Sequence, residues 1–142
     1  MPSVISNFFS ADHDRLDSLF AAFQKTIPEN PSKAIAYFRK FKEGLIRHIE
    51  WEEELLFPRF ESATGMFNAG PTKVMVHEHV RIKSLLEEID MAIAEGEECL
   101  TPVESLLQLL GEHNMKEEKI LYFQCDRLIP QDEIDNMLLT LA

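Results

Sequence analysis

The stretch FRKFKEGLIRHIEWEEELLFP, residues 38–58, decides the fold of this chain. Its inward-facing residues recur at alternating steps of three and four, which is the spacing of a helix that buries one stripe. That row consists of Phe38, Phe41, Leu45, His48, Glu52 and Leu55. A histidine and a glutamate interrupt the apolar row, so we expect both side chains inside the protein core.

Three more segments show the same spacing, and turn-forming residues separate them. The breaks fall at residues 28–31, 65–71 and 96–102, and at Pro130. Asn30 followed by Pro31 has the form of a helix start, and residues 101–104 have the form of a capping box. The pattern predicts an all-α fold: an up-down-up-down antiparallel four-helix bundle with a short C-terminal fifth helix over residues 131–142. The four helices share this pattern without a convincing internal sequence repeat.

The inward rows of the other three helices also contain histidine. The first row is Phe9, His13, Leu16, Phe20, Phe23 and Ile27. The third is Met75, His79, Ile82, Leu86, Ile89 and Ile93. The fourth is Val103, Leu106, Leu110, His113, Glu117, Ile120 and Gln124. Every long helix is therefore expected to place at least one histidine inside the bundle.

Counting from the turns places these polar residues at one level of the bundle. His13 lies fourteen residues before Ile27, and His48 lies fourteen residues after Ala34. At a rise of about 1.5 Å per residue, both histidines lie roughly 21 Å from the turn that joins their helices. Similar counting across the next turn brings Glu52 to the level of His79. The polar residues of the seam are therefore expected to form one layer.

A metal centre is the reading that this layer favours. A single inward histidine is more often an ordinary core residue, but a buried carboxylate without a cation costs several kcal/mol. The rows contain no lysine or arginine, and the pairs His48-x-x-x-Glu52 and His113-x-x-x-Glu117 each put an imidazole and a carboxylate on one helix face. Four imidazoles and two carboxylates suit a dinuclear site. Iron is favoured, and manganese and zinc stay open.

The composition of the chain argues against nucleic-acid binding and membrane association. The chain has 142 residues with 45% hydrophobic content, which suits one domain over residues 1–142. Its net charge of -11 opposes binding to nucleic acid or to an anionic membrane. No apolar run reaches the roughly 20 residues that span a bilayer, and the start of the chain lacks the pattern of a signal peptide. We expect a cytoplasmic protein. Cys99 and Cys125 form no CxxC pair and are read as ordinary thiols.

Four segments carry a resemblance to a known family. They are DHDRLD around His13, HIEWEEELLFP from His48, VMVHEHVRI around His79 and HNMKEEKILYF from His113. Together they resemble the hemerythrin-like, or HHE cation-binding, family over nearly the whole chain. The resemblance implies two non-haem iron ions, bridged by carboxylate and by an oxo or hydroxo group. It implies metal ligands at His13, His48, Glu52, His79, His113 and Glu117.

The sequence departs from the oxygen-carrying hemerythrins, which have a His-x-x-x-His pair on the third helix. Met75 stands at the first of these positions, so the set looks like the iron-sulfur-repair and nitric-oxide-responsive branch. His77 lies about 200° around the helix from His79 and is read as a surface residue or as one that only contacts a ligand. Two further interpretations concern residues near the predicted ligands. Glu50, Glu53, Glu54 and Glu118 are read as solvated faces. Trp51 and Tyr122 are read as aromatic packing at the bundle surface, and hydrogen bonds from them to the ligands are the alternative.

The leading hypothesis is a di-iron protein that reacts with or senses dioxygen, nitric oxide, peroxide or redox state. One alternative is a module that stores or senses iron without catalysis, and another is a reversible oxygen carrier. The sequence leaves enzymatic activity, the redox partner and homodimer formation open. A ferritin-like oxidase is disfavoured, because the Glu-x-x-His pairs of that class do not occur here.

Overall fold

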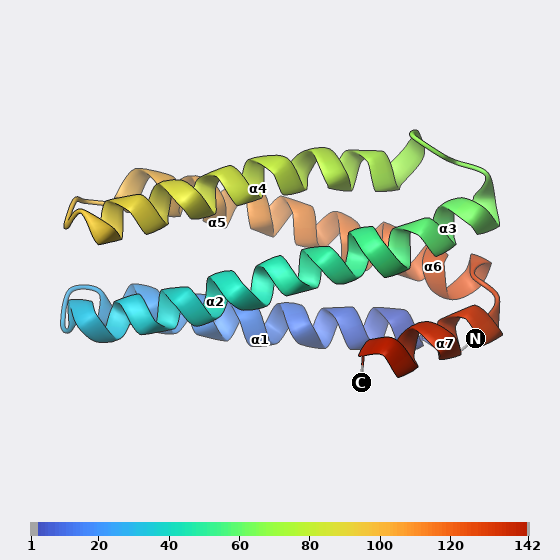
Figure 1. Cartoon of the computed structure of the whole chain (residues 1–142), viewed down its shortest axis with the longest axis horizontal. Coiled ribbons are helices and arrows are strands. Elements are labelled where there is room, and N and C mark those ends of the chain that lie inside the picture. Colours follow the sequence, from blue (N-terminus) through green and yellow to red (C-terminus); the bar gives the residue numbers. More distant parts are fainter. Residues whose placement is uncertain (1–2, 142) are drawn as a thin grey trace.

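The computed structural model describes residues 3–141. The predicted fold is confirmed: four long helical rods lie side by side, and a short helix folds back along the outside of the bundle at one end (Figure 1). No strand occurs between residues 3 and 141. The helical segments are α1 (Val4–Thr26), α2 (Pro31–Trp51), η1 (Glu52–Leu56), α3 (Phe57–Thr64), α4 (Gly70–Ala94), α5 (Leu100–Lys116), η2 (Glu117–Leu121), α6 (Tyr122–Leu128) and α7 (Gln131–Leu141). Ala142, the last residue of the predicted fifth helix, lies outside the described residues.

Two of the four rods are composite. α2, η1 and α3 follow one another without a break, and so do α5, η2 and α6. The first rod is α1 and the third is α4, and successive rods run in opposite directions (Figure 1). α1 packs mainly against α2, and α4 packs mainly against α5, so the bundle consists of two helical hairpins. None of the described helices is long and apolar enough to cross a membrane.

The turns explain where the helices begin and end. The Asn30 side chain accepts a hydrogen bond from the backbone N–H of Lys33 at 3.2 Å, and Pro31 opens α2, as predicted. Gly65 ends α3 at φ +77°, a left-handed conformation that favours glycine. The predicted capping box at residues 101–104 is wrong: α5 begins at Leu100, and Cys99 at its N-cap position makes no side-chain hydrogen bond to the helix.

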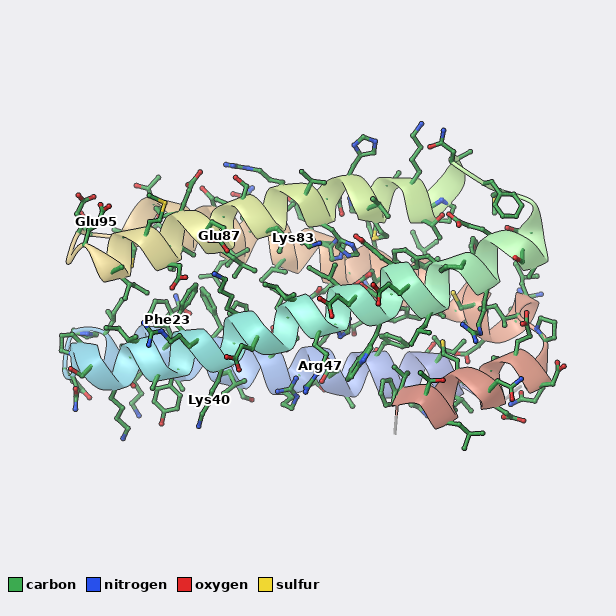
Figure 2. The ribbon with its side chains drawn as sticks, viewed as in Figure 1. Phe23, Lys40, Arg47, Lys83, Glu87 and Glu95 are labelled. Carbon is green, nitrogen blue, oxygen red and sulfur yellow. The ribbon has the colours of Figure 1, made fainter. Side chains whose placement is uncertain are left out.

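The interior divides into two apolar clusters. Side chains fill the space between the rods along the bundle, and Phe23 lies near the end where α1 turns into α2 (Figure 2). That end contains a cluster of aromatic side chains in which Phe20 and Phe41 are 4.7 Å apart between ring centroids. The opposite end holds the second cluster, to which α7 contributes Ile134 and Met137. Along each rod, the polar residues of the predicted layer fall between these two clusters.

Two π-helical turns, η1 and η2, change which residues face the core. The sequence rows predicted Leu55 and Ile120 inside, but Leu56 and Leu121 are the buried residues, and Ile120 is 51% exposed. A π-helical turn contains an extra residue compared with an α-helical turn, so every later position rotates around the helix. For the same reason Cys125 is buried where Gln124 was predicted.

Candidate metal centre

All six residues of the predicted layer are buried and meet in the middle of the bundle. His13 comes from α1, His48 from α2 and His79 from α4, and His113 comes from α5. The two glutamates, Glu52 and Glu117, are each the first residue of a π-helical turn, and neither is exposed to solvent. The α-helical spacing of four residues holds between each glutamate and the histidine before it, because the π turns begin only at the glutamates.

The donor atoms gather into two groups that share Glu117. One group, the His13 subsite, contains His13, His48 and Glu117. The other, the His79 subsite, contains Glu52, His79, His113 and Glu117. Within each group, one donor atom per residue lies within 4.8 Å of all the others, which is close enough for a single cation to contact them together. The geometry thus offers two adjacent cation positions.

The carboxylate of Glu52 reaches both subsites. Its Oε1 atom lies 3.2 Å from His79 Nε2, and its Oε2 atom lies 3.5 Å from His48 Nε2. Glu117 Oε1 lies 3.2 Å from His13 Nε2 and 3.3 Å from His113 Nε2. Each glutamate therefore lies beside histidines of both hairpins and would be available to a cation in either subsite.

A second set of carboxylates orients the imidazoles. The Nδ1 atoms of the four histidines contact carboxylate oxygens: His13 with Glu118 at 2.8 Å, His48 with Asp12 at 2.8 Å, His79 with Glu53 at 2.6 Å, and His113 with Glu78 at 2.8 Å. A carboxylate accepts hydrogen bonds, so each Nδ1 carries a hydrogen, and each Nε2 atom faces the centre, where it binds a cation once it is deprotonated. Such outer carboxylates are the usual partners of metal-binding histidines.

Two of these carboxylates overturn a prediction. Glu53 and Glu118 were read as solvated faces, but each bonds a buried histidine. They directly follow the two central glutamates, and the π turns bring these neighbouring positions toward the other hairpin. A sequence signal did exist: an acidic residue lies next to His13, Glu52, His79 and Glu117 in the chain.

The contacts repeat between the two hairpins, although the sequence suggested no internal repeat. Asp12 precedes His13 and bonds His48, and Glu78 precedes His79 and bonds His113. Likewise Glu53 bonds the histidine of α4, while Glu118 bonds the histidine of α1. The site therefore has an approximate two-fold pattern of contacts that relates the α1–α2 hairpin to the α4–α5 hairpin.

Tyr122 takes the hydrogen-bonding role that the sequence suggested only as the alternative. It was read as surface packing, but its side chain is fully buried and its hydroxyl lies inside the site. The hydroxyl donates a hydrogen bond to Glu52 Oε2 at 2.6 Å and lies 3.1 Å from Glu117 Oε1. In an α-helix, the fifth residue after Glu117 would point about 140° away from it. The π turn removes most of that rotation.

The donor set fits a bound cation on the evidence of its own hydrogen bonding. Within residues 3–141, the buried side-chain atoms without a hydrogen-bond partner include Glu52 Oε1, His79 Nε2 and Glu117 Oε2, all in this site. The 3.2 Å approach of His79 Nε2 to Glu52 Oε1 is short, but the atoms are not aligned as a hydrogen bond. Leaving buried polar groups unpaired is costly, and a cation would pair all three.

The electrostatics of the protein without metal point the same way. Burial opposes charge on His48, but the Glu52 carboxylate and the hydrogen bond to Asp12 outweigh it and raise the pKa from 6.5 to about 10. Burial likewise opposes charge on His79, but the adjacent carboxylates of Glu52 and Glu53 outweigh it and raise the pKa to about 9. Burial favours the neutral form of Glu52, yet His48 and the surrounding donors hold its pKa well below 4.5. The buried carboxylates of the layer therefore favour a positive charge beside them, carried either by protonated histidines or by a bound cation.

Met75 and His77 occupy the places expected of them. Met75 is buried in the apolar cluster next to the site, four residues before His79. His77 is exposed, so it does not join the donor set.

Comparisons with known proteins agree with this site. The family model described as the hemerythrin HHE cation binding domain matches residues 4–125. A curated relative, a DNA nickase of Nostoc sp. strain PCC 7120, is 30% identical over 118 residues, which are 83% of this chain and 32% of the relative. The chain thus spans about a third of that relative's length. No solved structure matches the chain.

Proposed function

Because this chain belongs to the hemerythrin HHE cation-binding family, we propose that its core holds two non-haem iron ions that react with or sense dioxygen, nitric oxide, peroxide or redox state. The observation that carries the proposal is the layer itself. Four imidazole Nε2 atoms and two fully buried carboxylates converge there, and three of these donor atoms lack any hydrogen-bond partner. His13, His48, Glu52, His79, His113 and Glu117 are the proposed ligands.

Donor chemistry supports iron. The layer offers nitrogen and oxygen donors, which suit iron in either common oxidation state, and neither cysteine belongs to the donor groups. Zinc would accept the same imidazoles, but it prefers four ligands and a single tetrahedral site. Two adjacent positions that share glutamates favour a pair of ions able to exchange electrons.

The count of protein donors supports reaction with small molecules. Each subsite offers three or four protein residues, and an octahedral ion would therefore keep positions for an external ligand. Iron in such a site supplies electrons and an open coordination position. The chain's own residues bind the ions, fix the imidazoles through outer carboxylates and keep bulk water out of the layer. Burial restricts the external ligand to very small molecules.

DNA is not part of this proposal. The name of the Nostoc relative connects that protein with DNA and runs against the expectation of no nucleic-acid partner. The matched segment is 32% of the relative, and the net charge of -11 repels a phosphate backbone. Incubation with supercoiled plasmid, with and without iron, tests this point: nicking that disappears in Glu52→Ala would add DNA to the function.

Metal content and gas reactivity test the proposal. Protein purified without added metal or chelator is analysed by elemental mass spectrometry, and we expect two iron ions per chain. The reduced protein is then mixed anaerobically with nitric oxide, or separately with dioxygen, while the visible spectrum is recorded. A spectral change with each gas is expected. A chain that stays free of iron after anaerobic loading contradicts the proposal.

Two other outcomes identify the alternatives. Iron binding without any gas response would indicate storage or sensing of iron. A dioxygen adduct that forms and releases dioxygen intact would indicate an oxygen carrier. Glu117→Ala is the matched negative control for both measurements.

A further inference from the structure

The hydroxyl of Tyr122 occupies the His13 subsite. Its oxygen lies 3.3 Å from His13 Nε2, 3.2 Å from His48 Nε2 and 3.1 Å from Glu117 Oε1. These atoms belong to the three residues that form the His13 subsite. A fully buried phenol therefore stands among the proposed ligands of one ion, and the proposed function gives it no role.

The distances match those between ligands of one ion. Nitrogen and oxygen donors bind such metals at about 2.0–2.2 Å, so two donors at right angles around an ion lie about 3.0 Å apart. His13 Nε2 and Glu117 Oε1, both proposed ligands, are 3.2 Å apart. The oxygen of Tyr122 keeps the same spacing from three donors at once. This spacing suits hydrogen bonds in the metal-free site, and it equally suits ligands around one ion.

The two-fold pattern of contacts shows that this oxygen is an addition to one subsite. Phe57 follows Glu52 by five residues just as Tyr122 follows Glu117, and each is the first residue after a π turn. Phe57 stacks on His79 at 5.9 Å between ring centroids, and Tyr122 packs against His13 at 5.7 Å. The rings are thus equivalent in position, and only the His13 subsite gains a hydroxyl.

We propose that the phenol oxygen of Tyr122 is a direct ligand of the iron ion in the His13 subsite, which makes the two irons chemically unlike. The inference rests on the proposed di-iron function. On binding, the O–H bond of Tyr122 breaks, its proton passes to solvent and an oxygen–iron bond forms, as for other ligands that bind deprotonated.

The competing role for Tyr122 is that of a hydrogen-bond donor. Without metal, the hydroxyl donates to Glu52 Oε2 at 2.6 Å, and it could keep that proton in the loaded protein. Burial and the neighbouring carboxylates raise the pKa of the phenol in the metal-free site, whereas a cation bound beside the oxygen would favour the deprotonated form. The two roles differ in one measurable property: only a phenolate bound to ferric iron absorbs visible light by charge transfer from the ring.

The test is resonance Raman spectroscopy of the iron-loaded full chain, oxidised with ferricyanide and excited in the visible band. Iron per chain is measured on the same samples. We expect ring vibrations of a bound tyrosinate in the wild type and in Tyr37→Phe, which removes the only other tyrosine of the chain. We expect their loss in Tyr122→Phe at saturating iron. The exchange variant Phe57→Tyr/Tyr122→Phe should regain them, because the phenol then enters the His79 subsite.

The outcomes separate the two proposals. A wild type that binds two irons without tyrosinate vibrations overturns the Tyr122 ligand and leaves the di-iron function intact. The same holds if Tyr122→Phe keeps the vibrations. A wild type that binds no iron overturns both. The wild-type spectrum decides the question by itself if Tyr122→Phe fails to fold.

Discussion

At the scale of single residues, one set of side chains is placed to bind a metal, and a second set orients the histidines. The six proposed ligands point donor atoms at the centre, whereas Asp12, Glu53, Glu78 and Glu118 contact only the outer nitrogens of the histidines. The hydrogen bond from His79 lowers the pKa of Glu53, which keeps that carboxylate charged and able to orient the ring. Mutations in the two sets of residues should therefore reduce metal binding to different extents.

Removing a central carboxylate should abolish tight iron binding. Glu52→Ala or Glu117→Ala deletes a donor that both subsites use, so we expect loss of at least one iron per chain by elemental mass spectrometry. His77→Ala is the matched control: the histidine lies on α4 two residues from His79 but is exposed, and the variant should keep its iron. The reverse result would contradict the ligand assignment.

Removing an outer carboxylate should weaken binding without abolishing it. Glu118→Ala deletes the partner of His13 Nδ1, and loss of such a partner costs about 10–100-fold in metal affinity. Competition with a chelator of known affinity measures this change. Glu54→Ala removes an exposed glutamate from the equivalent region of the other hairpin and should bind iron like the wild type. Equal affinities in the two variants would argue against an orienting role.

At the scale of the elements, the π turns decide what could be read from the sequence. Up to Glu52 and Glu117 the α-helical period holds, so the layer of six residues and the bundle could be predicted from spacing. Beyond them the extra residue rotates the rods, and the period points to the wrong side chains. The roles of Glu53, Glu118 and Tyr122 depend on this rotation, and nothing in the local sequence announces a π turn.

Stability measurements on neighbouring residues of η2 test its register. Leu121 is 1% exposed and Ile120 is 51% exposed, although an uninterrupted α-helix would place Ile120 inside. Leu121→Ala should therefore lower the free energy of unfolding by about 2–5 kcal/mol. Ile120→Ala should change it by about 0.5 kcal/mol or less, as is usual for exposed positions. Urea unfolding of both variants makes the comparison, and a larger loss for Ile120→Ala would rule out the π turn.

At the scale of the whole molecule, the polar layer makes the folding stability depend on pH and on metal binding. In the metal-free protein, His48 and His79 hold protons with pKa values of about 10 and about 9, whereas the unfolded chain binds them only below about 6.5. The folded state thus binds more protons than the unfolded state between these limits. Stability therefore falls as the pH rises through this range. The depressed pKa of Glu52 adds a loss at the acid end.

Thermal unfolding at several pH values checks the sign. With chelator present, the midpoint should be highest between about pH 4.5 and 6.5 and should fall toward pH 10. With iron bound, the imidazoles are coordinated without protons, so the alkaline fall should shrink or vanish. A metal-free protein whose midpoint rises from pH 6.5 to 10 would contradict the charge balance described for the layer.

The repeated contacts of the two hairpins also explain how the two subsites of one metal centre can come to differ. Each hairpin supplies one lone histidine, one His-x-x-x-Glu pair and two outer acids, which is half of everything the layer contains. Two identical hairpins joined as a homodimer would be bound by exact symmetry to treat both ions alike. Joining the hairpins in a single chain releases that constraint, since position 57 can carry phenylalanine while position 122 carries tyrosine. A single continuous chain can therefore give the two adjacent cation positions different surroundings, which a symmetric pair of hairpins could not do.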